Sequence, residues 1–204
     1  MVTTGFSKPY VAKYSNTGTA VTYTGGMVLG RGVGLSLEID TADDNNFYAD
    51  NALAETETAQ FVNGSATITI DGLDNNAATV ILGLPAPTSF TPGEGDPVQM
   101  QGYGAGMNPP FVGFGCVRRT QMNGTVEYWP LILPKVKFGL PGDEAATQED
   151  QIDWQTQELE ATVMRDDTAA QNWKVISAKG MATEAAAYAV VVAYLGGGRA
   201  MRRA

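Results

Sequence analysis

Several segments of the chain alternate apolar and polar residues with a period of two, the pattern of a half-buried β-strand. From Val33 to Asp40 the odd-numbered residues are apolar and the even-numbered ones are small or acidic. Ser65 to Ile70 repeats the pattern, with Ala66, Ile68 and Ile70 on the apolar side. Strands with one apolar and one polar face are typical of antiparallel sheets that cover a core on one side and meet water on the other. The alternation therefore predicts a mainly antiparallel β-protein.

The clearest hairpin is predicted from Phe111–Arg119 and Thr125–Leu133. Between them stands Asn123-Gly124, the strongest short signal for a type I′ turn. The remaining strands are expected at Pro9–Tyr14, Val21–Tyr23, Asn46–Ala49, Leu53–Phe61, Leu133–Phe138, Ile152–Met164 with a bulge near Gln157, and Trp173–Ala178.

In two segments the apolar residues recur with the spacing of an α-helix instead of the period of two of a strand. In the first, the apolar residues at i, i+3, i+4 and i+7 are Ala77, Val80, Ile81 and Leu84. Asp74 is expected to cap this helix, and Gly83 to end it. The second helix is expected at Thr183–Leu195, with a buried stripe of Tyr188, Val192 and Leu195.

These elements predict an α+β fold that is mainly β, an antiparallel β-sandwich with one or two short packed α-helices and long hairpins. With 204 residues the chain fits a single domain, expected at residues 1–195. A long loop rich in Gly and Pro is expected at about residues 85–110, and a flexible Gly/Arg tail at residues 196–204.

The charge of the chain is unevenly distributed. The chain has 22 acids and 13 bases, and residues 32–117 contain eleven of the acids and no base. Glu38, Asp40, Glu55 and Glu57 lie on the polar sides of expected strands, and the other acids of this stretch lie mostly in loops. One interpretation is a solvated acidic face that favours solubility. The other is a surface of one sign that repels phosphate.

The composition disfavours several classes of chemistry. The chain has no histidine, the commonest general base and metal ligand, and Cys116 is its single cysteine. Glu55 and Glu57 could act as an acid–base pair only inside a pocket. We therefore expect no enzyme, and no catalytic, cofactor-binding or metal-binding site. A single cysteine allows no intramolecular disulfide, so cytoplasmic assembly is expected. The N-terminus lacks the pattern of a signal peptide, and no apolar run reaches the ~20 residues of a membrane span.

The basic and aromatic residues suggest contacts with other molecules instead of catalysis. We expect Arg31, Arg118 and Arg119 to meet the acidic surface of a neighbouring copy. Nucleic-acid binding by so few bases in an acidic chain is a weaker interpretation. The alternative function is a carbohydrate-binding or host-recognition β-module, in which Trp129, Trp154 and Trp173 stack on sugars.

The order of several motifs resembles the phage major tail protein family named after phage phi13. The residues that carry the resemblance are Asn46–Asn51, Phe111–Arg119, Leu133–Phe138, Ile152–Thr156, Met164–Asp167, Trp173–Ile176 and the helix that begins at Thr183-Glu184-Ala185. The resemblance covers most of the chain from Pro9 to Leu195. The segment after Leu195 does not match.

The resemblance implies a virion structural protein, the tail tube subunit of a phage with a long, non-contractile tail or of a prophage. Six copies would form a ring, and stacked rings a tube that encloses the tape measure protein and conducts the DNA without binding it specifically. Tail terminator and tail-tip proteins are the further partners implied. Because bases would hold phosphates, Glu38, Asp40, Glu55 and Glu57 are expected on the lumen side.

Overall fold

The structure is a computed structural model that describes residues 2–18, 20–57, 60–93, 95–142 and 155–196. It is mainly β, with 53% strand and 11% helix. In chain order its elements are β1 (Val2–Asn16), β2 (Val21–Val28), β3 (Gly32–Thr41), β4 (Asn45–Ala49), β5 (Ala52–Glu57), β6 (Phe61–Ile70), α1 (Asn75–Leu82), β7 (Thr88–Phe90), β8 (Val98–Met100), β9 (Val112–Met122), β10 (Thr125–Phe138), β11 (Gln157–Met164), β12 (Val175–Ile176) and α2 (Glu184–Tyr194).

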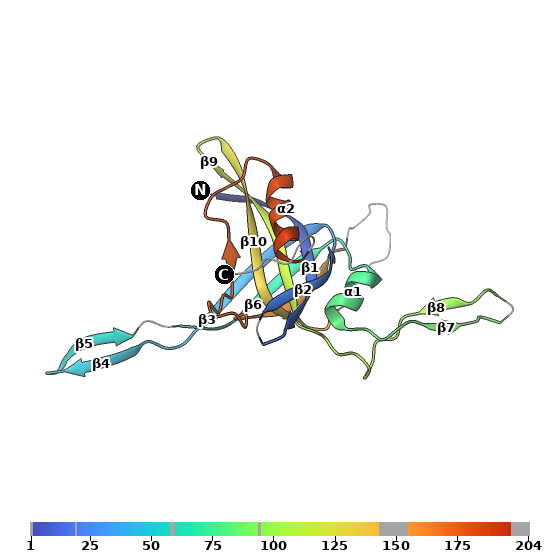
Figure 1. Ribbon diagram of the computed structural model, residues 1–204, viewed down its shortest axis with the longest axis horizontal. Coiled ribbons are helices and arrows are strands. Elements are labelled where there is room, and N and C mark those ends of the chain that lie inside the picture. The colour runs from blue at the N-terminus through green and yellow to red at the C-terminus, as the bar shows by residue number, and fades with distance from the viewer. Residues whose placement is uncertain (1, 19, 58–59, 94, 143–154, 197–204) are drawn as a thin grey trace.

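One large antiparallel sheet forms the body of the protein (Figure 1). Its strand order is β2-β1-β9-β10-β11-β6-β3, and β12 pairs with β10 beside β11. The sheet curls, so that side chains from β1, β9 and β10 share one apolar core with side chains from β6 and β11. The predicted fold class, mainly β and antiparallel with two short helices, is confirmed.

The alternation seen in the sequence creates this core. Ala66, Ile68 and Ile70 of β6 are buried, as predicted, and pack in one cluster with Phe114 of β9 and Leu133 of β10. Burial of each large apolar side chain of this kind stabilises the fold by about 1.5–3 kcal/mol. The curled sheet thus closes over its own inward rows of side chains.

The β9–β10 hairpin forms as predicted. Met122 and Thr125 are partners in register, which leaves the two-residue turn Asn123-Gly124. Both turn residues have positive φ, 49° and 82°, as a type I′ turn requires. This turn sets the register that continues along β9 and β10 to the core.

Helix α1 also follows the prediction. The side chain of Asp74 accepts a hydrogen bond from the backbone N–H of Asn76, and Gly83 ends the helix with φ 61° and ψ 45°. Ala77, Val80 and Ile81 are buried. The helix therefore covers one end of the core, close to where the chain leaves the body toward β7 (Figure 1).

Helix α2 lies on the outer face of β1, β9 and β10, and its buried stripe differs from the prediction. Leu195 is buried as predicted, but the other buried residues are Ala187 and Val191, whereas Tyr188 and Val192 are half-buried. The helix is apolar nearly all round, so the sequence pattern alone did not fix which stripe faces the sheet. The close approach of α2 to β9 decides which stripe of the helix is buried against the sheet.

That close approach depends on glycine in β9. A Cβ atom at Gly115 would lie 2.5 Å from Cγ1 of Val191, and one at Gly113 would lie 2.6 Å from Cδ2 of Leu195. No real Cβ atom lies so close to another carbon atom, so a side chain here would push α2 away from the sheet.

We predict that Gly115→Val lowers the free energy of unfolding by about 1–3 kcal/mol, because the larger side chain overpacks the α2 contact. The measurement is urea denaturation followed by circular dichroism. Gly102→Ala is the matched control, since a Cβ atom there meets nothing within 4 Å. Equal stability of the two variants would contradict the packing of α2 on Gly115.

Other predictions about strands were wrong in part. Val33 was expected to face the core, but it is 57% exposed because the register shifts between Gly32 and Gly34. The expected strand Leu53–Phe61 is two strands, β5 and β6. No bulge occurs near Gln157, where β11 begins in regular register with β6. Residues 152–154 of that expected strand lie outside the described residues.

The expected long loop at residues 85–110 contains the hairpin β7–β8. Its strands are only three residues each, too short for the alternation to stand out among the surrounding glycines and prolines. Most of the expected tail, residues 197–204, lies outside the described residues. Within the described part of the chain, no helix has the length and apolar character needed to cross a membrane.

Candidate assembly surfaces

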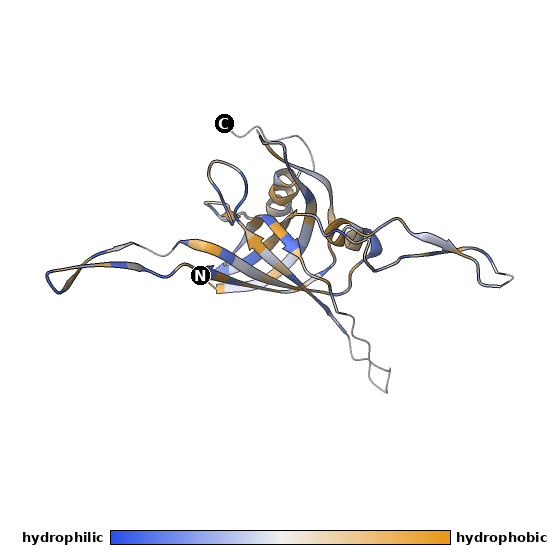
Figure 2. Cartoon of the chain, turned by 90° about the horizontal axis from the view of Figure 1, so that it is seen from below, coloured by the Kyte–Doolittle hydropathy of each residue, from blue (hydrophilic) through white to orange (hydrophobic). Residues whose placement is uncertain are grey.

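Two hairpins project from the body toward opposite sides (Figure 1), and a view turned by 90° shows the same arrangement (Figure 2). The first arm is residues 42–60, with strands β4 and β5. The second arm is residues 85–106, with strands β7 and β8. Each hairpin is a two-stranded sheet of its own, outside the main sheet.

The first arm is built as a continuation of the edge of the sheet. At its root, the backbone N–H of Ala42 donates to the carbonyl oxygen of Gln60 at 2.9 Å. At its tip, Asp50 and Asn51 have φ angles of 50° and 62°, the two positive values of a type I′ turn. This turn was not predicted, because Asp-Asn is a weaker signal than Asn-Gly or Asp-Gly.

The surface of the first arm is both apolar and acidic. Phe47, Tyr48 and Leu53 are each more than half exposed. The arm also contains acids and no base. An isolated two-stranded hairpin is marginally stable in water, and exposed large apolar residues indicate a contact surface. The first arm is therefore a candidate surface for another protein chain.

The second arm has the same character with fewer charges. Phe90, Met100 and Tyr103 are each more than half exposed. At its root the side-chain amide of Gln101 donates to the carbonyl oxygen of Pro85 at 2.8 Å. The molecule thus has at each end of its long axis one arm (Figure 2), and each arm carries exposed apolar side chains.

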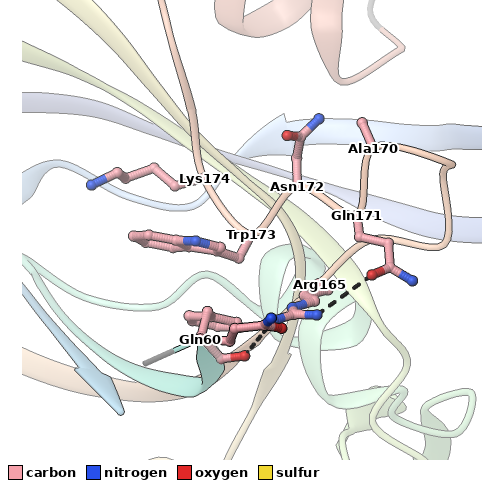
Figure 3. Close-up of a pocket in the computed structure, with 8 residues that line it drawn as sticks. Gln60, Arg165, Ala170, Gln171, Asn172, Trp173 and Lys174 are labelled. Atoms are coloured by element: carbon pink, nitrogen blue, oxygen red, sulfur yellow. Dashed lines mark hydrogen bonds between the residues drawn. The ribbon is translucent and has the colours of Figure 1, made fainter. Parts of the chain in front are cut away.

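A stack of side chains lies at the root of the first arm (Figure 3). The ring of Trp173 lies parallel to that of Phe61, with the ring centroids 4.9 Å apart and an interplanar angle of 1°. Nζ of Lys174 lies 4.6 Å from the Trp173 ring centroid, and Arg165 lies 5.9 Å from that of Phe61. Nη2 of Arg165 also donates to the carbonyl oxygen of Phe61 at 2.6 Å. The stack holds Phe61, the first residue after the arm, in a fixed position.

The tryptophans bear on the carbohydrate-binding alternative. Trp173 borders a surface hollow of about 370 Å³ (Figure 3), but Phe61 stacks on its ring and the Lys174 ammonium lies over it. Trp129 is mostly buried, and its indole N–H has no acceptor among the described residues. Trp154 lies outside the described residues. Neither described tryptophan presents the flat exposed platform on which a sugar stacks.

The predicted acids lie along the edge of the sheet and the first arm. Glu38 and Asp40 are exposed on β3, which leads directly into the arm, and Glu55 is exposed on β5. The backbone of Glu57 pairs with that of Asn45 at the base of the same hairpin. The structure therefore places these acids on consecutive elements, and a location beside the lumen stays a prediction.

The three predicted contact arginines are not brought together. Arg31 is 92% exposed at its side chain, and its Nε lies 2.6 Å from Oδ2 of Asp71. Hydrogen bonds from Arg31, first of all from its backbone N–H, lower the pKa of Asp71. Arg119 donates to Oγ1 of Thr4 at 2.8 Å. Arg118 points to the opposite face of β9, and its Nε is buried without a partner among the described residues.

One cluster of polar residues was missed by sequence reasoning. Nζ of Lys135 lies 2.8 Å from Oδ2 of Asp167, and the hydroxyl of Tyr14 donates to the same oxygen at 2.8 Å. The hydrogen bonds from Lys135 and Tyr14 lower the pKa of Asp167, and burial raises the pKa of Tyr14 to about 12. Tyr14 lies on β1, Lys135 on β10 and Asp167 just after β11. Only the arrangement of these strands in one sheet brings the three residues together, so no local pattern could reveal them.

We predict that Asp167→Asn lowers the free energy of unfolding at pH 7 by up to about 1 kcal/mol, because the pair with Lys135 is partly exposed to solvent. The folded pKa of Asp167 is lower than the unfolded value of about 3.9. Its contribution is therefore present above pH 4 and is lost as the pH falls through the folded pKa. Urea denaturation at pH 7 and pH 3 should show the difference between wild type and variant shrinking at pH 3. A constant difference would contradict the role of the charge.

Among the described residues, no group of three or more His, Cys, Asp or Glu side chains could hold a metal ion. No protein-family model matches the chain, and no curated protein matches it. The function is therefore inferred from the residues and surfaces described above.

Proposed function

We propose that this chain is the structural subunit of a phage tail tube, in which six copies close into a ring and rings stack into a tube. The observation that carries the proposal is the pair of apolar arms that project in opposite directions from one curled sheet. Two different contact surfaces at opposite ends of a subunit favour head-to-tail association, which repeats from copy to copy. The resemblance to the phage major tail protein family supports the same assembly.

The distribution of charge supports a conduit for DNA. Residues 32–117 contain eleven acids and no base, and Glu38, Asp40 and Glu55 are exposed. A wall that carries these acids repels phosphates, so DNA passes along it without being held. In this proposal the tube encloses the tape measure protein during assembly in the host cytoplasm, and its ends meet the tail terminator and tail-tip proteins.

The test is electron microscopy of the purified protein, together with its mass in solution by light scattering over a range of concentrations. The expected result is rings or tubes with a central hole and a mass that rises in steps with concentration. A protein that remains monomeric at millimolar concentration contradicts the proposal.

A glycan array distinguishes the carbohydrate-binding alternative. The tail tube proposal predicts no binding to any glycan by the wild-type protein at concentrations where rings form. Saturable binding that Trp173→Ala abolishes would instead support the carbohydrate-binding module.

A further inference from the structure

Arg118 is a charged residue in a row of side chains on the core side of β9. Val112, Phe114 and Cys116 precede it in that row and are fully buried in the core. The register of β9 with β10 is regular from Cys116 to Arg118, so strand alternation keeps Arg118 on the same side. Arginine is rarely buried on the core side of a sheet unless an acid pairs with it.

No acid pairs with Arg118 in the part of the chain that the structure describes. Its guanidinium takes part in no ion pair there. Glu127 on β10 is the register partner of Thr120 and faces the same side of the sheet, but its carboxylate lies against Gly180. The positive charge of Arg118 therefore lacks the partner that a half-buried guanidinium normally has.

The guanidinium of Arg118 is covered at its inner end and open at its outer end. The side chain is half-buried, and its Nε is buried without a hydrogen-bond partner among the described residues. Its two Nη atoms have no hydrogen bond to a described residue either, and they are not buried. A molecule in solution can therefore reach the two Nη atoms.

Aromatic side chains stand on both sides of Arg118. Its register partners are Phe6 on β1 and Trp129 on β10, and all three side chains face the same side of the sheet. Side chains directly opposite one another on neighbouring strands have Cβ atoms about 5 Å apart. Phe6 and Trp129 are themselves half-buried. An apolar surround of this kind limits the access of water and strengthens the attraction between the guanidinium and an anion.

The chemistry of these groups selects the ligand. A guanidinium only donates hydrogen bonds, and its two Nη atoms match the two oxygens of one planar carboxylate. One negative charge balances the one positive charge of Arg118, whereas the second charge of a phosphate dianion would stay unpaired beside the aromatic rings. We propose that Arg118, between Phe6 and Trp129, forms a binding site for a carboxylate group of another molecule. This site does not depend on the proposed tube.

The test is a titration of the wild-type protein in which sodium acetate replaces sodium chloride at constant ionic strength, followed by nuclear magnetic resonance. The probes are the Nε–H resonance of Arg118 and the indole N–H resonance of Trp129, assigned from their absence in Arg118→Met and Trp129→Phe. Both should shift and saturate in the millimolar range of acetate, because a few charge-assisted hydrogen bonds supply that affinity. The indole resonance of Trp173 should not move. The absence of a saturable shift overturns the proposal.

Neighbouring positions on β9 provide matched variants. Arg118→Met keeps an apolar stem, and the Trp129 resonance should then need at least about tenfold more acetate to shift. Arg118→Lys keeps the charge without the planar pair of donors and should also bind acetate more weakly than wild type. Arg119→Met lies on the opposite face, where Arg119 donates to Thr4, and should leave acetate binding unchanged. Equal losses in Arg118→Met and Arg119→Met overturn the site, and the wild-type titration decides alone if a variant does not fold.

Two further measurements identify the ligand and its source. Inorganic phosphate that binds as tightly as acetate overturns the carboxylate assignment. The source is either a small organic acid or an acidic side chain of a second copy. If a second copy supplies the carboxylate, the Trp129 resonance moves toward its acetate-bound position as the protein concentration rises; if it does not move, the ligand is a small acid.

The outcomes separate this site from the proposed function. A protein that binds acetate through Arg118 but forms no rings contradicts the tube subunit and leaves the carboxylate site in place. A protein that forms rings but shows no saturable response to acetate contradicts the carboxylate site and leaves the tube subunit in place.

Discussion

Removal of the first arm should abolish tube formation and leave the body folded. In the test variant, residues 43–59 are replaced by Asn-Gly between Ala42 and Gln60, whose backbones are already joined by a hydrogen bond of 2.9 Å. The arm supplies exposed apolar residues and nothing to the core, so stability should change by less than about 1 kcal/mol. Electron microscopy and light scattering measure assembly, and thermal denaturation measures the fold.

A second variant tests whether the apolar residues of the arm are responsible. Phe47→Ser, Tyr48→Ser and Leu53→Ser together keep the length of the arm and all its acids, and they should prevent tube formation as completely as the deletion. Normal tubes from either variant would contradict the role of the first arm. Loss of the folded body in the deletion variant would instead show that the arm contributes to the fold.

Phe114→Ala should cost about 3–5 kcal/mol of unfolding free energy, the largest effect expected from a single side chain. Phe114 is fully buried on β9 and belongs to the core cluster that β6, β10 and α1 share. Its truncation removes apolar contacts and leaves a cavity that strands on several sides cannot fill. Urea denaturation of the monomer at neutral pH measures the change.

Phe111→Ala is the matched control for Phe114→Ala. Phe111 stands just before β9 and is 40% exposed, and its ring contacts are the ammonium groups of Lys135 and Lys137. Loss of these contacts should cost about 1 kcal/mol. Equal losses for the two variants would show that the core is not centred on Phe114.

Elements with a strong local signal could be predicted from the sequence. The turn Asn123-Gly124 fixes the β9–β10 hairpin because both residues tolerate positive φ. The spacing from Ala77 to Leu84, with Asp74 and Gly83 as caps, specifies α1. Ile68 and Ile70 reach the core because alternation in a strand places them on one face. In each case the interactions that decide the structure lie within a few residues.

Elements without such a signal were missed or misplaced. The hairpin β7–β8 is too short to show a period, and α2 is too uniformly apolar for its buried stripe to be read. Phe61 stacks on Trp173, and Tyr14 contacts both Asp167 and Lys135; each of these partners lies more than a hundred positions further along the chain. Pairing between distant strands creates these contacts, and the residues on either side of each partner in the sequence do not indicate that pairing.

The amino-acid sequence alone specified the mainly β class, the β9–β10 hairpin, helix α1 and a base-free stretch rich in acids. It did so because backbone geometry and charge are local properties of the residues. The folded chain was needed to show that this stretch contains an edge strand and both exposed arms, and that the two arms project from opposite sides. The curl of the sheet sets those directions, and it arises from the packing of side chains that meet only when the chain has folded.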